Sequence, residues 1–384
     1  MSTATESANY CLQRGSSSSC HIDHTVRVDC ARKRMVCRMR WHRRLHTLAI
    51  LLGILAGGGS LAGCGLLMDA AQWVRPVPSS LPDDLAVICR HEQLHVGIAN
   101  NPTPPFVFLL AEKTPEITGL DIELLHAITA AISRECGRPV RAVPILLPVR
   151  DLFIELTEGR VDLFLSAMAA NMPHLNATGI GYSAPYFSHT GIIALTRDPQ
   201  VAERIRTTFQ ELLNAGHHVA EARRIAFRGL TVAVQEGRTG HLLAKARLTD
   251  SRLLVCDTLT AAFASDQSPD VVLGKQKTLE FLEQREPSVW QPLVLDHAKP
   301  LLLVHEQYAV VLAETKYHLR WLVNDLLWEL EESGRLADMR RRWLTPSYPD
   351  SAEALKIAVP CSECKESRVK SPGSCRITHT PTTK

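Results

Sequence analysis

The sequence predicts an α/β protein with parallel sheets, and three observations carry this prediction. Short apolar runs typical of strands alternate along the chain with longer segments whose apolar residues recur at helical spacing. The chain has 384 residues, which is enough for two domains of ordinary size. Its composition is 45% hydrophobic, so both domains can build a core. We therefore expect a globular protein and not a fibrous or disordered one.

The first half of the chain begins this alternation. A strand is predicted at 94–100, LHVGIAN, and a loop with several prolines follows it. Segment 119–136 is predicted to be a helix with one apolar face, with Asp121 placed to cap its start and Gly137 just past its end. The next predicted elements are a strand at 138–147, a helix at 149–160 that closes at Gly159, and a strand at 161–168. Gly159 and Asp162 are expected to shape the turn between the helix and the second of these strands.

A run without any Asp, Glu, Lys or Arg extends from Leu163 to Thr196. Asparagine, histidine and proline residues interrupt it, so no apolar segment of the ~18 residues that suggest a membrane span survives. We interpret the run as the third strand, one wall of a binding site, and a strand that leaves the first domain.

The second half continues the same pattern. Two polar helical stretches are predicted at 200–215 and 219–226, and 229–248 reads as strand, glycine-bearing turn and helix. Short strands are predicted at 269–274 and 307–314, and two final helices meet at Gly334. Beyond Thr345 the composition turns to Pro, Ser, Thr and Lys, and we expect 346–384 to be a disordered tail.

The N-terminal region has the layout of an export signal. In residues 39–63 arginines precede an apolar stretch and then small residues, and Leu61-Ala62-Gly63-Cys64 is similar to the bacterial lipobox, in which the cysteine is acylated. The alternative is an ordinary signal anchor with a chance cysteine. We expect Cys64 to carry a lipid anchor, 64–86 to be a tether, and 1–38 to be an upstream segment without fold.

Cysteine usage gives two further expectations. An exported chain can form disulfides, and Cys89 with Cys136 is the one pair within the folded part that we consider. The CSEC stretch at 361–364 has zinc-like spacing, but only Cys375 and His379 follow it, so we assign it to the tail. We expect no metal and no cofactor.

Charge argues against nucleic-acid binding. The formal net charge is +3, but nine of the 43 Lys and Arg residues lie within 1–63, against three of the 40 Asp and Glu residues. The rest of the chain is therefore about neutral and lacks the basic field that nucleic-acid binding requires.

Seven motifs in sequence give a resemblance to a known family. They are LHVGIANNPTPPF, GLDIELL, EGRVDLFLSAM, YSAPYF, LTVAVQEGRTG, PDVVLG and LLWELEESGRLADMRRRWL, and they span Leu85 to Leu344. In this order they resemble the bacterial extracellular solute-binding proteins of family 3, which serve amino-acid ABC transporters.

The resemblance implies a type II periplasmic binding protein fold, with two α/β lobes joined by two hinge strands around a solute cleft. Lobe 1 would comprise 87–195 and 306–345, and lobe 2 would comprise 196–305. It also implies a small polar solute, a permease or sensor in the inner membrane as partner, a periplasmic or envelope location, and a monomer.

The sequence departs from the family where the solute carboxylate is held. Family members place an Arg there in a Thr-Pro-Glu-Arg pattern, because a guanidinium fits a carboxylate with two parallel bonds. This chain has Asn171 in place of that Thr, His174 in place of that Arg, and Ala169 at the preceding Ser/Thr position. His174 is either a neutral partner in the cleft or a surface loop residue.

Two cations occupy positions where the family has other residues. Lys275 stands where relatives hold the solute ammonium with an Asp, and a lysine there would repel an ammonium and attract an anion. The alternative is that the alignment with the family is shifted at this point and that Lys275 is simply solvated. Arg238 lies between Gly237 and Thr239, where relatives have Gly-Thr-Thr at a helix start. It either replaces the missing anion clamp or points to solvent.

The expected solute site follows from these positions. Phe106, or Tyr182 or Tyr186, could stack on an apolar part of the solute or pack within the lobe. The expected ligand-binding residues are Phe106, Ser166, Met168, Ala169, Asn171, His174, Arg238, Thr239 and Lys275.

The leading functional prediction is a lipid-anchored binding protein for a small polar, anionic solute, without catalytic activity. Lobe closure around the solute would give binding. A dehydratase-like enzyme on the same fold is one alternative; its buried acid or base would have to come from His174, His189 or Glu236. The other alternative is an envelope accessory protein that has lost solute binding.

Overall fold

The computed structural model describes the chain from residue 81 onward, in seven ranges. These are 81–110, 115–171, 178–285, 290–296, 299–345, 355–360 and 374–379. The expected signal segment, Cys64, the tether up to residue 80, His174 and the CSEC stretch lie outside them. Within these ranges every helix is too short or too polar to cross a lipid bilayer.

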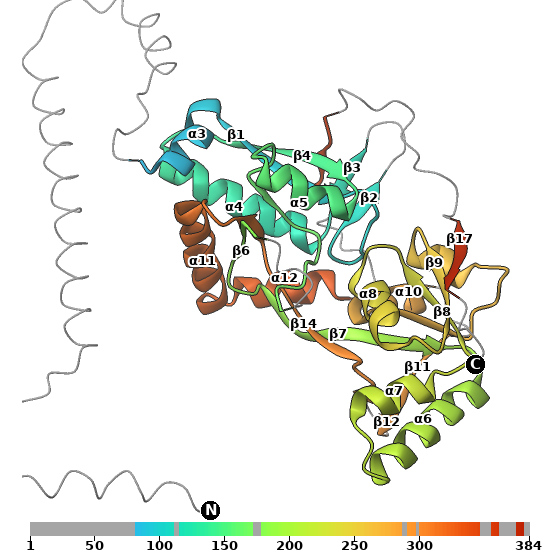
Figure 1. Cartoon of the computed structure of the whole chain (residues 1–384). Helices are drawn as coiled ribbons and strands as arrows, with labels where there is room; N and C mark the ends of the chain where they lie inside the picture. The colour runs from blue at the N-terminus through green and yellow to red at the C-terminus, as the bar shows by residue number, and fades with distance from the viewer. Residues whose placement is uncertain are drawn as a thin grey trace, which may run out of the picture. The chain divides into compact units, whose positions relative to one another are not determined.

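The first lobe is built on a five-stranded mixed sheet (Figure 1). Its strands, in spatial order, are β4 (Arg141–Leu147), β1 (Gln93–Ala99), β5 (Leu163–Phe164), β15 (Val311–Ala313) and β6 (Ile180–Tyr182). β1 pairs in parallel with β4 and β5, and β15 pairs antiparallel with β5 and β6. Parallel neighbours need crossover connections, which the expected helices supply.

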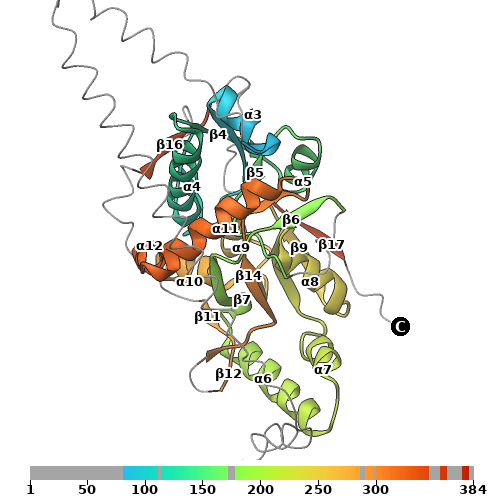
Figure 2. The same ribbon diagram turned by 90° about the vertical axis from the view of Figure 1, so that its left-hand side faces the viewer.

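Helices from both ends of the chain cover this sheet (Figure 2). They are α3 (Asp83–His91), α4 (Leu120–Cys136), α5 (Val149–Thr157), α11 (Tyr317–Glu332) and α12 (Arg335–Trp343). The expected end of α4 is confirmed, because Gly137 takes the left-handed conformation at its C-cap with φ 65°. The Cys89–Cys136 disulfide is also confirmed and joins the C-terminal ends of α3 and α4.

The second lobe is built on a seven-stranded sheet. Its main path is β11 (Gln291–Pro292), β7 (Phe187–Thr196), β10 (Val271–Lys275), β8 (Thr231–Gln235), β9 (Arg252–Cys256) and β17 (Cys375–His379), with β14 (Val304–Tyr308) on β7. Strands β8, β9 and β10 are parallel. The helices of this lobe are α6 (Pro199–Asn214), α7 (Val219–Ala226), α8 (Thr239–Arg247), α9 (Leu259–Phe263) and α10 (Gln276–Arg285).

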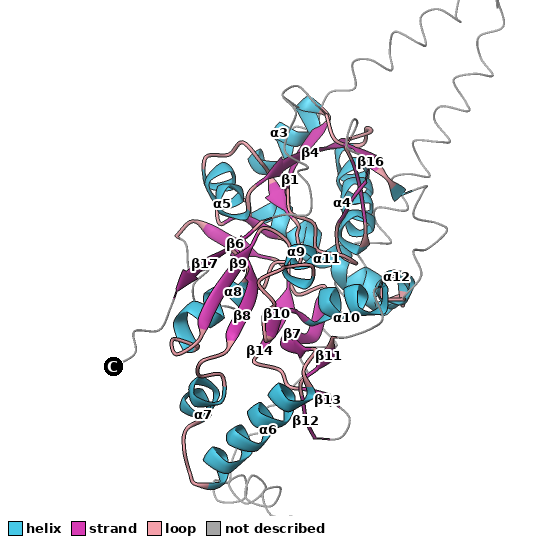
Figure 3. Ribbon diagram, turned by 90° about the vertical axis from the view of Figure 1, so that its right-hand side faces the viewer, coloured by secondary structure: helices cyan, strands magenta, loops and turns pink. Residues whose placement is uncertain are grey.

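Helices of the second lobe take two kinds of position. Figure 3 shows α8 and α10 beside the strands of the sheet, whereas α6 and α7 extend from the end of the lobe. The two helical stretches predicted at 200–215 and 219–226 correspond to α6 and α7. Their apolar residues Ile205, Phe209, Ala222 and Ala226 are buried in the core of this lobe.

Two antiparallel strands join the lobes, β7 leaving the first and β14 returning to it. Gly191 on β7 allows their close approach, because a Cβ atom at this position would overlap the carbonyl oxygen of Val304. This pairing places β7 in the second sheet.

The C-terminal segment corrects the expectation of a wholly disordered tail. β16 (Ile357–Ala358) pairs with β3 (Glu116–Thr118), which itself pairs with β2 (Phe108–Leu110). β17 pairs with β9 as an edge strand of the second sheet. A small hairpin, β12 (Val294–Asp296) with β13 (Lys299–Pro300), completes the described strands.

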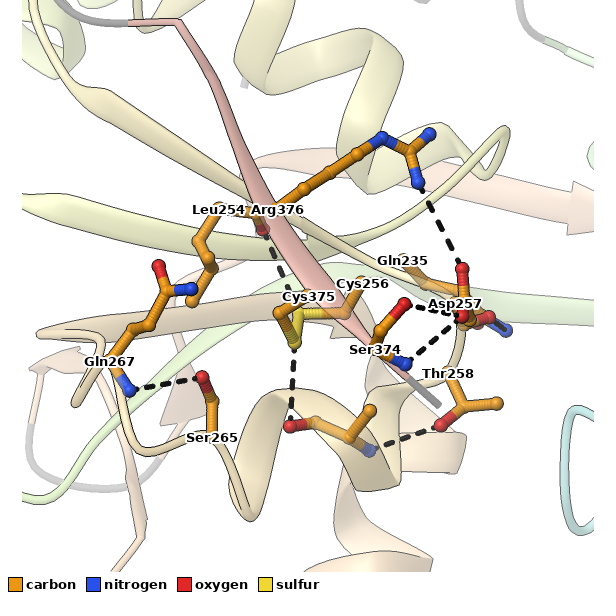
Figure 4. Close-up of a disulfide and its surroundings, with 11 residues drawn as sticks. Gln235, Leu254, Cys256, Asp257, Thr258, Ser265, Gln267, Ser374, Cys375 and Arg376 are labelled. Atoms are coloured by element: carbon orange, nitrogen blue, oxygen red, sulfur yellow. Dashed lines mark hydrogen bonds and ion pairs between the residues drawn. A yellow bond between two sulfur atoms is a disulfide. The ribbon is translucent and has the colours of Figure 1, made fainter. Parts of the chain in front are cut away.

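A second disulfide, Cys256–Cys375, fixes β17 to β9 (Figure 4). Asp257, directly after β9, accepts hydrogen bonds from the Ser374 main-chain N (3.0 Å) and hydroxyl (3.2 Å). Arg376 also forms an ion pair with Glu236. The composition of the tail is polar, but a covalent bond and these polar contacts hold its last strand in place.

Candidate functional site

Four charged side chains gather in the interior where the two lobes meet, and we call them the charged cluster. They are Asp121, Arg238, Lys275 and Glu306, each no more than 5% exposed. Asp121 lies in α4, Arg238 occupies the N-cap position of α8, Lys275 ends β10 and Glu306 lies in β14. Buried charges persist only when they are paired or hydrogen bonded, so the partners of each are decisive.

Lys275 and Glu306 form a buried ion pair. The Lys275 Nζ lies 3.2 and 3.3 Å from the two carboxylate oxygens of Glu306. Tyr308 donates from its hydroxyl to the same carboxylate at 2.9 Å, and its ring lies 4.2 Å from the lysine Nζ. Burial lowers the pKa of Lys275, and the Glu306 carboxylate opposes this. Lys275 is only 4% exposed, so the alternative that it is solvated is wrong.

Arg238 connects the two lobes. From the second lobe, its Nη2 donates to the main-chain oxygen of Asn101 at 2.8 Å and to the Asn101 Oδ1 at 2.9 Å. Its Nη1 lies 3.4 Å from the main-chain oxygen of Ser166. Burial lowers its pKa to about 10, so it stays charged at neutral pH. The alternative that it points to solvent is wrong, because it is 5% exposed.

The Arg238 Nε has no hydrogen-bond partner among the described residues, although it is buried. A buried donor without an acceptor is costly, so it marks a position where an acceptor would be stabilised.

Asp121 is a buried carboxyl and not the helix cap that the sequence suggested. Gly119 occupies the N-cap position of α4, and no side chain caps it. The Asp121 oxygens accept from the Ala167 main-chain N and from the Tyr186 hydroxyl, both at 2.7 Å. Burial raises its pKa to about 7, although these hydrogen bonds and the nearby cations lower it. Its charge therefore changes near neutral pH.

An aromatic group packs beside the charged cluster. The Phe106 ring is fully buried, with its centroid 5.2 Å from Phe187 and 5.1 Å from Tyr308, both in edge contacts. Of the two interpretations of Phe106, packing against other side chains is the one with observed contacts, and these partners lie on β7 and β14, the strands that join the lobes.

The structure brings several of the other expected site residues close to this cluster. Ser166 is fully buried and accepts from the Ala99 main-chain N at 2.8 Å, while Ala169 forms a β-bridge with Tyr308. Met168 is 6% and Thr239 7% exposed. Asn171 is exposed, and its side chain makes two hydrogen bonds of 3.0 Å with the main chain. It donates to the oxygen of His305 and accepts from the N of Gln307.

Sequence reasoning missed Asp121, Glu306 and Asn101 as parts of this site. A signal was present for the first two, because each is an acidic residue within a mainly apolar run, GLDIELL and LLLVHEQYAVV. If such a run forms part of the core, its acidic residue is buried and requires a hydrogen-bonding or charged partner. Asn101 carried no such signal, since asparagine is common in loops.

Comparison with known proteins identifies the family. The family model described as bacterial extracellular solute-binding proteins, family 3, matches residues 94–346. The chain belongs to this family. Family 3 proteins are extracellular solute-binding proteins, and the two-lobe type II fold expected from the sequence is confirmed. The family description also places this member outside the cytoplasm, in the periplasm or envelope.

Solved structures share this fold at low sequence identity. A mutant of ArgBP from T. maritima is 21% identical, with a TM-score of 0.54 over 68% of this chain and 98% of that one. AbpA from Streptococcus pneumoniae bound to L-arginine is 20% identical, with a TM-score of 0.52 over 67% and 97%.

The ancestral amino acid-binding protein AncCDT-1, a precursor of cyclohexadienyl dehydratase, is 21% identical. Its TM-score is 0.51 over 68% of this chain and 99% of that one. None of the curated proteins matches this chain.

Proposed function

We propose that this family 3 member captures a small polar, anionic solute in an interlobe cleft beside the charged cluster. It delivers the solute to an ABC permease or a sensor in the inner membrane while anchored by a lipid on Cys64. The observation that carries the proposal is the buried Nε–H of Arg238, which lacks an acceptor among the described residues. A carboxylate or phosphate oxygen would satisfy it.

The start of α8 supports an anion at the same place. Arg238 is the N-cap residue of this nine-residue helix, and Thr239 follows it with 7% exposure. Main-chain N–H groups at a helix N-terminus, together with the helix dipole, favour negative charge. The arginine and the helix start therefore act on the same group of the solute.

Lys275 contributes less to anion binding than the sequence suggested. Its charge is balanced by Glu306 at 3.2 Å, so the pair presents little net charge to a solute. The pair instead links β10 to β14 across β7, which pairs with both strands. The anionic preference thus depends on Arg238, with Asp121 adding negative charge as pH rises through about 7.

Solved relatives support a solute with a carboxylate. AbpA, one of the solved structures with this fold, is described as bound to L-arginine, which carries a carboxylate. At the position where the family resemblance leads us to expect an arginine after strand three, this chain has His174, which lies outside the described residues. We propose that Arg238 takes over the contact with the carboxylate from the other lobe.

The test is to measure thermal unfolding of the protein in the presence of each member of a panel of carboxylates and phosphate esters. Their uncharged amide or ester counterparts are measured in the same way. A specific solute at 100 times its Kd stabilises the folded state by ~2.7 kcal/mol, and its neutral counterpart does not. Arg238→Ala should remove this stabilisation, and Arg238→Lys should restore only part of it, because lysine lacks the planar fork.

Arg247→Ala is the matched control, since Arg247 lies exposed at the other end of α8. Unchanged affinity in Arg238→Ala, or equal loss in Arg247→Ala, would remove Arg238 from the site. Failure of every solute to stabilise the protein would favour the accessory-protein alternative.

One observation favours a dehydratase-like enzyme as a second candidate. Asp121 is a buried acid with a pKa raised to about 7, the range suited to general acid or base catalysis near neutral pH. AncCDT-1 is described as a precursor of a dehydratase on this fold. Turnover of a prephenate-like acid by the wild-type protein, lost in Asp121→Asn, would establish the enzyme, and absence of turnover would eliminate it.

A further inference from the structure

The exposed aromatic side chains of the described residues gather on one helix, α11, and we call them the aromatic stripe. They are Tyr317, Trp321 and Trp328, with 51%, 66% and 56% of each residue exposed. The other two tryptophans in the described ranges, Trp290 and Trp343, are 9% and 1% exposed. A single exposed apolar residue needs no explanation, but a group of large aromatic ones marks an interaction surface.

The aromatic stripe lies on the side of α11 that faces away from the core. Because an α-helix turns by about 100° per residue, its three side chains project within an arc of about 40°. The buried residues of α11 project on the opposite side, into the core of the first lobe; they are Leu319, Val323, Leu326, Leu327 and Leu330. Figure 2 shows α11 on the side of the first lobe that faces the viewer. Packing of the lobe therefore does not account for the stripe.

Charged groups of opposite sign flank the two sides of the stripe. Asp325, Glu329 and Glu332 are exposed, and the helical turn places them along one side. Arg320 projects on the other side, with its guanidinium carbon 5.4 Å from the centroid of the Tyr317 ring. An anionic surface would be repelled by the carboxylates. A zwitterionic lipid headgroup would instead offer its ammonium to them and its phosphate to the arginine.

The part of the chain that leads to the proposed lipid joins the fold at the start of α11. Asp84, in the first turn of α3, accepts hydrogen bonds from the main-chain N of His318 at 2.9 Å and of Leu319 at 3.2 Å. Asp84 follows Cys64 by 20 residues, which reach at most about 70 Å. A lipid on Cys64 would therefore keep the start of α11 within that distance of a bilayer.

We propose that the aromatic stripe lies on the surface of a zwitterionic lipid bilayer, with Trp321 and Trp328 at the depth of the headgroups. Tryptophan and tyrosine favour this depth because their rings are apolar and carry one polar group. The negative surface potential of a membrane belongs to its cytoplasmic leaflet, and this protein lies outside the cytoplasm. The inference rests on the proposed lipid at Cys64 for proximity to the bilayer, and it fixes which face of the first lobe the bilayer meets.

The experiment is quenching of tryptophan fluorescence by phosphatidylcholine with brominated acyl chains. The full chain is purified with its anchor and reconstituted into vesicles of this lipid, with Trp41→Phe and Trp73→Phe as background, so that only the tryptophans of the described ranges emit. Emission should be weaker than in vesicles of unbrominated phosphatidylcholine. Trp321→Phe with Trp328→Phe should remove most of this quenching, because the remaining tryptophans are buried.

Val219→Trp, added to the variant that lacks Trp321 and Trp328, is the matched control. Val219 is 41% exposed and lies on α7 of the second lobe, so the new side chain is exposed but far along the chain from α11. Its emission should not be quenched. Equal quenching of this variant and of the protein with Trp321 and Trp328 would overturn the proposal.

Fatty-acid labelling of the same samples separates this proposal from that of the lipid anchor. Absence of quenching at Trp321 and Trp328 overturns the bilayer contact whether or not the protein is labelled. Quenching in unlabelled protein supports the contact and overturns the anchor. Sedimentation as a dimer that shields both tryptophans from the bilayer would assign the stripe to a second copy of the chain.

The composition of the vesicles tests the charge of the surface. Replacing roughly a third of the phosphatidylcholine with phosphatidylglycerol should weaken the quenching at low salt, and added salt should reverse the change. Stronger quenching in the anionic vesicles would overturn the assignment to a zwitterionic surface.

Discussion

Arg238 of the second lobe donates to both the main-chain and the side-chain oxygen of Asn101 in the first lobe, at 2.8 and 2.9 Å. A single guanidinium therefore fixes the two lobes to each other at the edge of the charged cluster. This contact must break when the lobes separate. It makes the stability of the protein sensitive to single substitutions at this junction.

Asn101→Ala should lower the free energy of unfolding by about 1–2 kcal/mol, because Arg238 loses one charge-assisted bond and keeps the main-chain one. Urea denaturation measures the loss, and faster amide exchange at 239–241 would place it at the start of α8. The neighbouring exposed residue supplies the control, Asn100→Ala. If Asn100→Ala lowers the free energy of unfolding as much as Asn101→Ala does, the contact with Arg238 is not the cause of the loss.

Asp121→Asn should change how stability depends on pH. Folded Asp121 keeps its proton up to about pH 7, whereas in the unfolded chain it ionises near its ordinary value of 3.8. Between these values the folded state binds more protons, so this group makes stability fall as pH rises from about 4 to about 7. The fall is at most about 4 kcal/mol, and it is complete above that range.

The difference in unfolding free energy between wild type and Asp121→Asn, measured from pH 4 to 8, isolates this group. It should shift in favour of the variant as pH rises. The exposed substitution Asp266→Asn should give no such trend. A wild-type curve parallel to that of Asp121→Asn would contradict the raised pKa.

Breaking the Lys275–Glu306 pair should be strongly destabilising. Glu306→Gln leaves a cation at 4% exposure without its counter-charge, at a cost of about 3–5 kcal/mol. Lys275→Met should cost a similar amount. The double variant should cost clearly less than the sum, since no unpaired charge remains. Additive losses in this cycle would show that the two side chains do not interact.

Removing the second disulfide should release the C-terminal strand. Cys256→Ser with Cys375→Ser should lower the free energy of unfolding by about 2–5 kcal/mol. Amide exchange of 375–379 should rise, because among the described residues β17 is then held by its ladder and the contacts of Asp257 and Glu236. The variant lacking Cys89 and Cys136 should also lose stability, but without faster exchange in β17.

Cys64→Ser should abolish membrane attachment. The proposed lipid on Cys64 gives stable anchoring only when more than one acyl chain is attached there. Cell fractionation and metabolic labelling with a radioactive fatty acid measure the outcome, and wild-type protein should be labelled and sediment with membranes. Labelled Cys64→Ser protein would contradict the assignment, while unlabelled but sedimenting protein would favour the signal-anchor alternative.

Much of the fold was predictable because it depends on local patterns. The apolar periodicity of α4 and the alternation of strands with helices are properties of neighbouring residues, and seven short motifs in order indicated the family. The tail was not predictable in this way. Its polar composition gave no sign that β17 would pair with β9, because the disulfide partner Cys256 lies 119 residues away.

The sequence by itself determined the two-lobe α/β fold, the family and the location outside the cytoplasm, because hydrophobic period and motif order are encoded locally. It also singled out Arg238 and Lys275 as candidate solute-binding cations. Only the tertiary structure decided which charges meet. It paired Lys275 with Glu306, left the Arg238 Nε without an acceptor among the described residues, and buried Asp121. The pairing and pKa of a buried charge depend on residues distant in sequence and on the exclusion of water, and neither can be obtained from a local pattern.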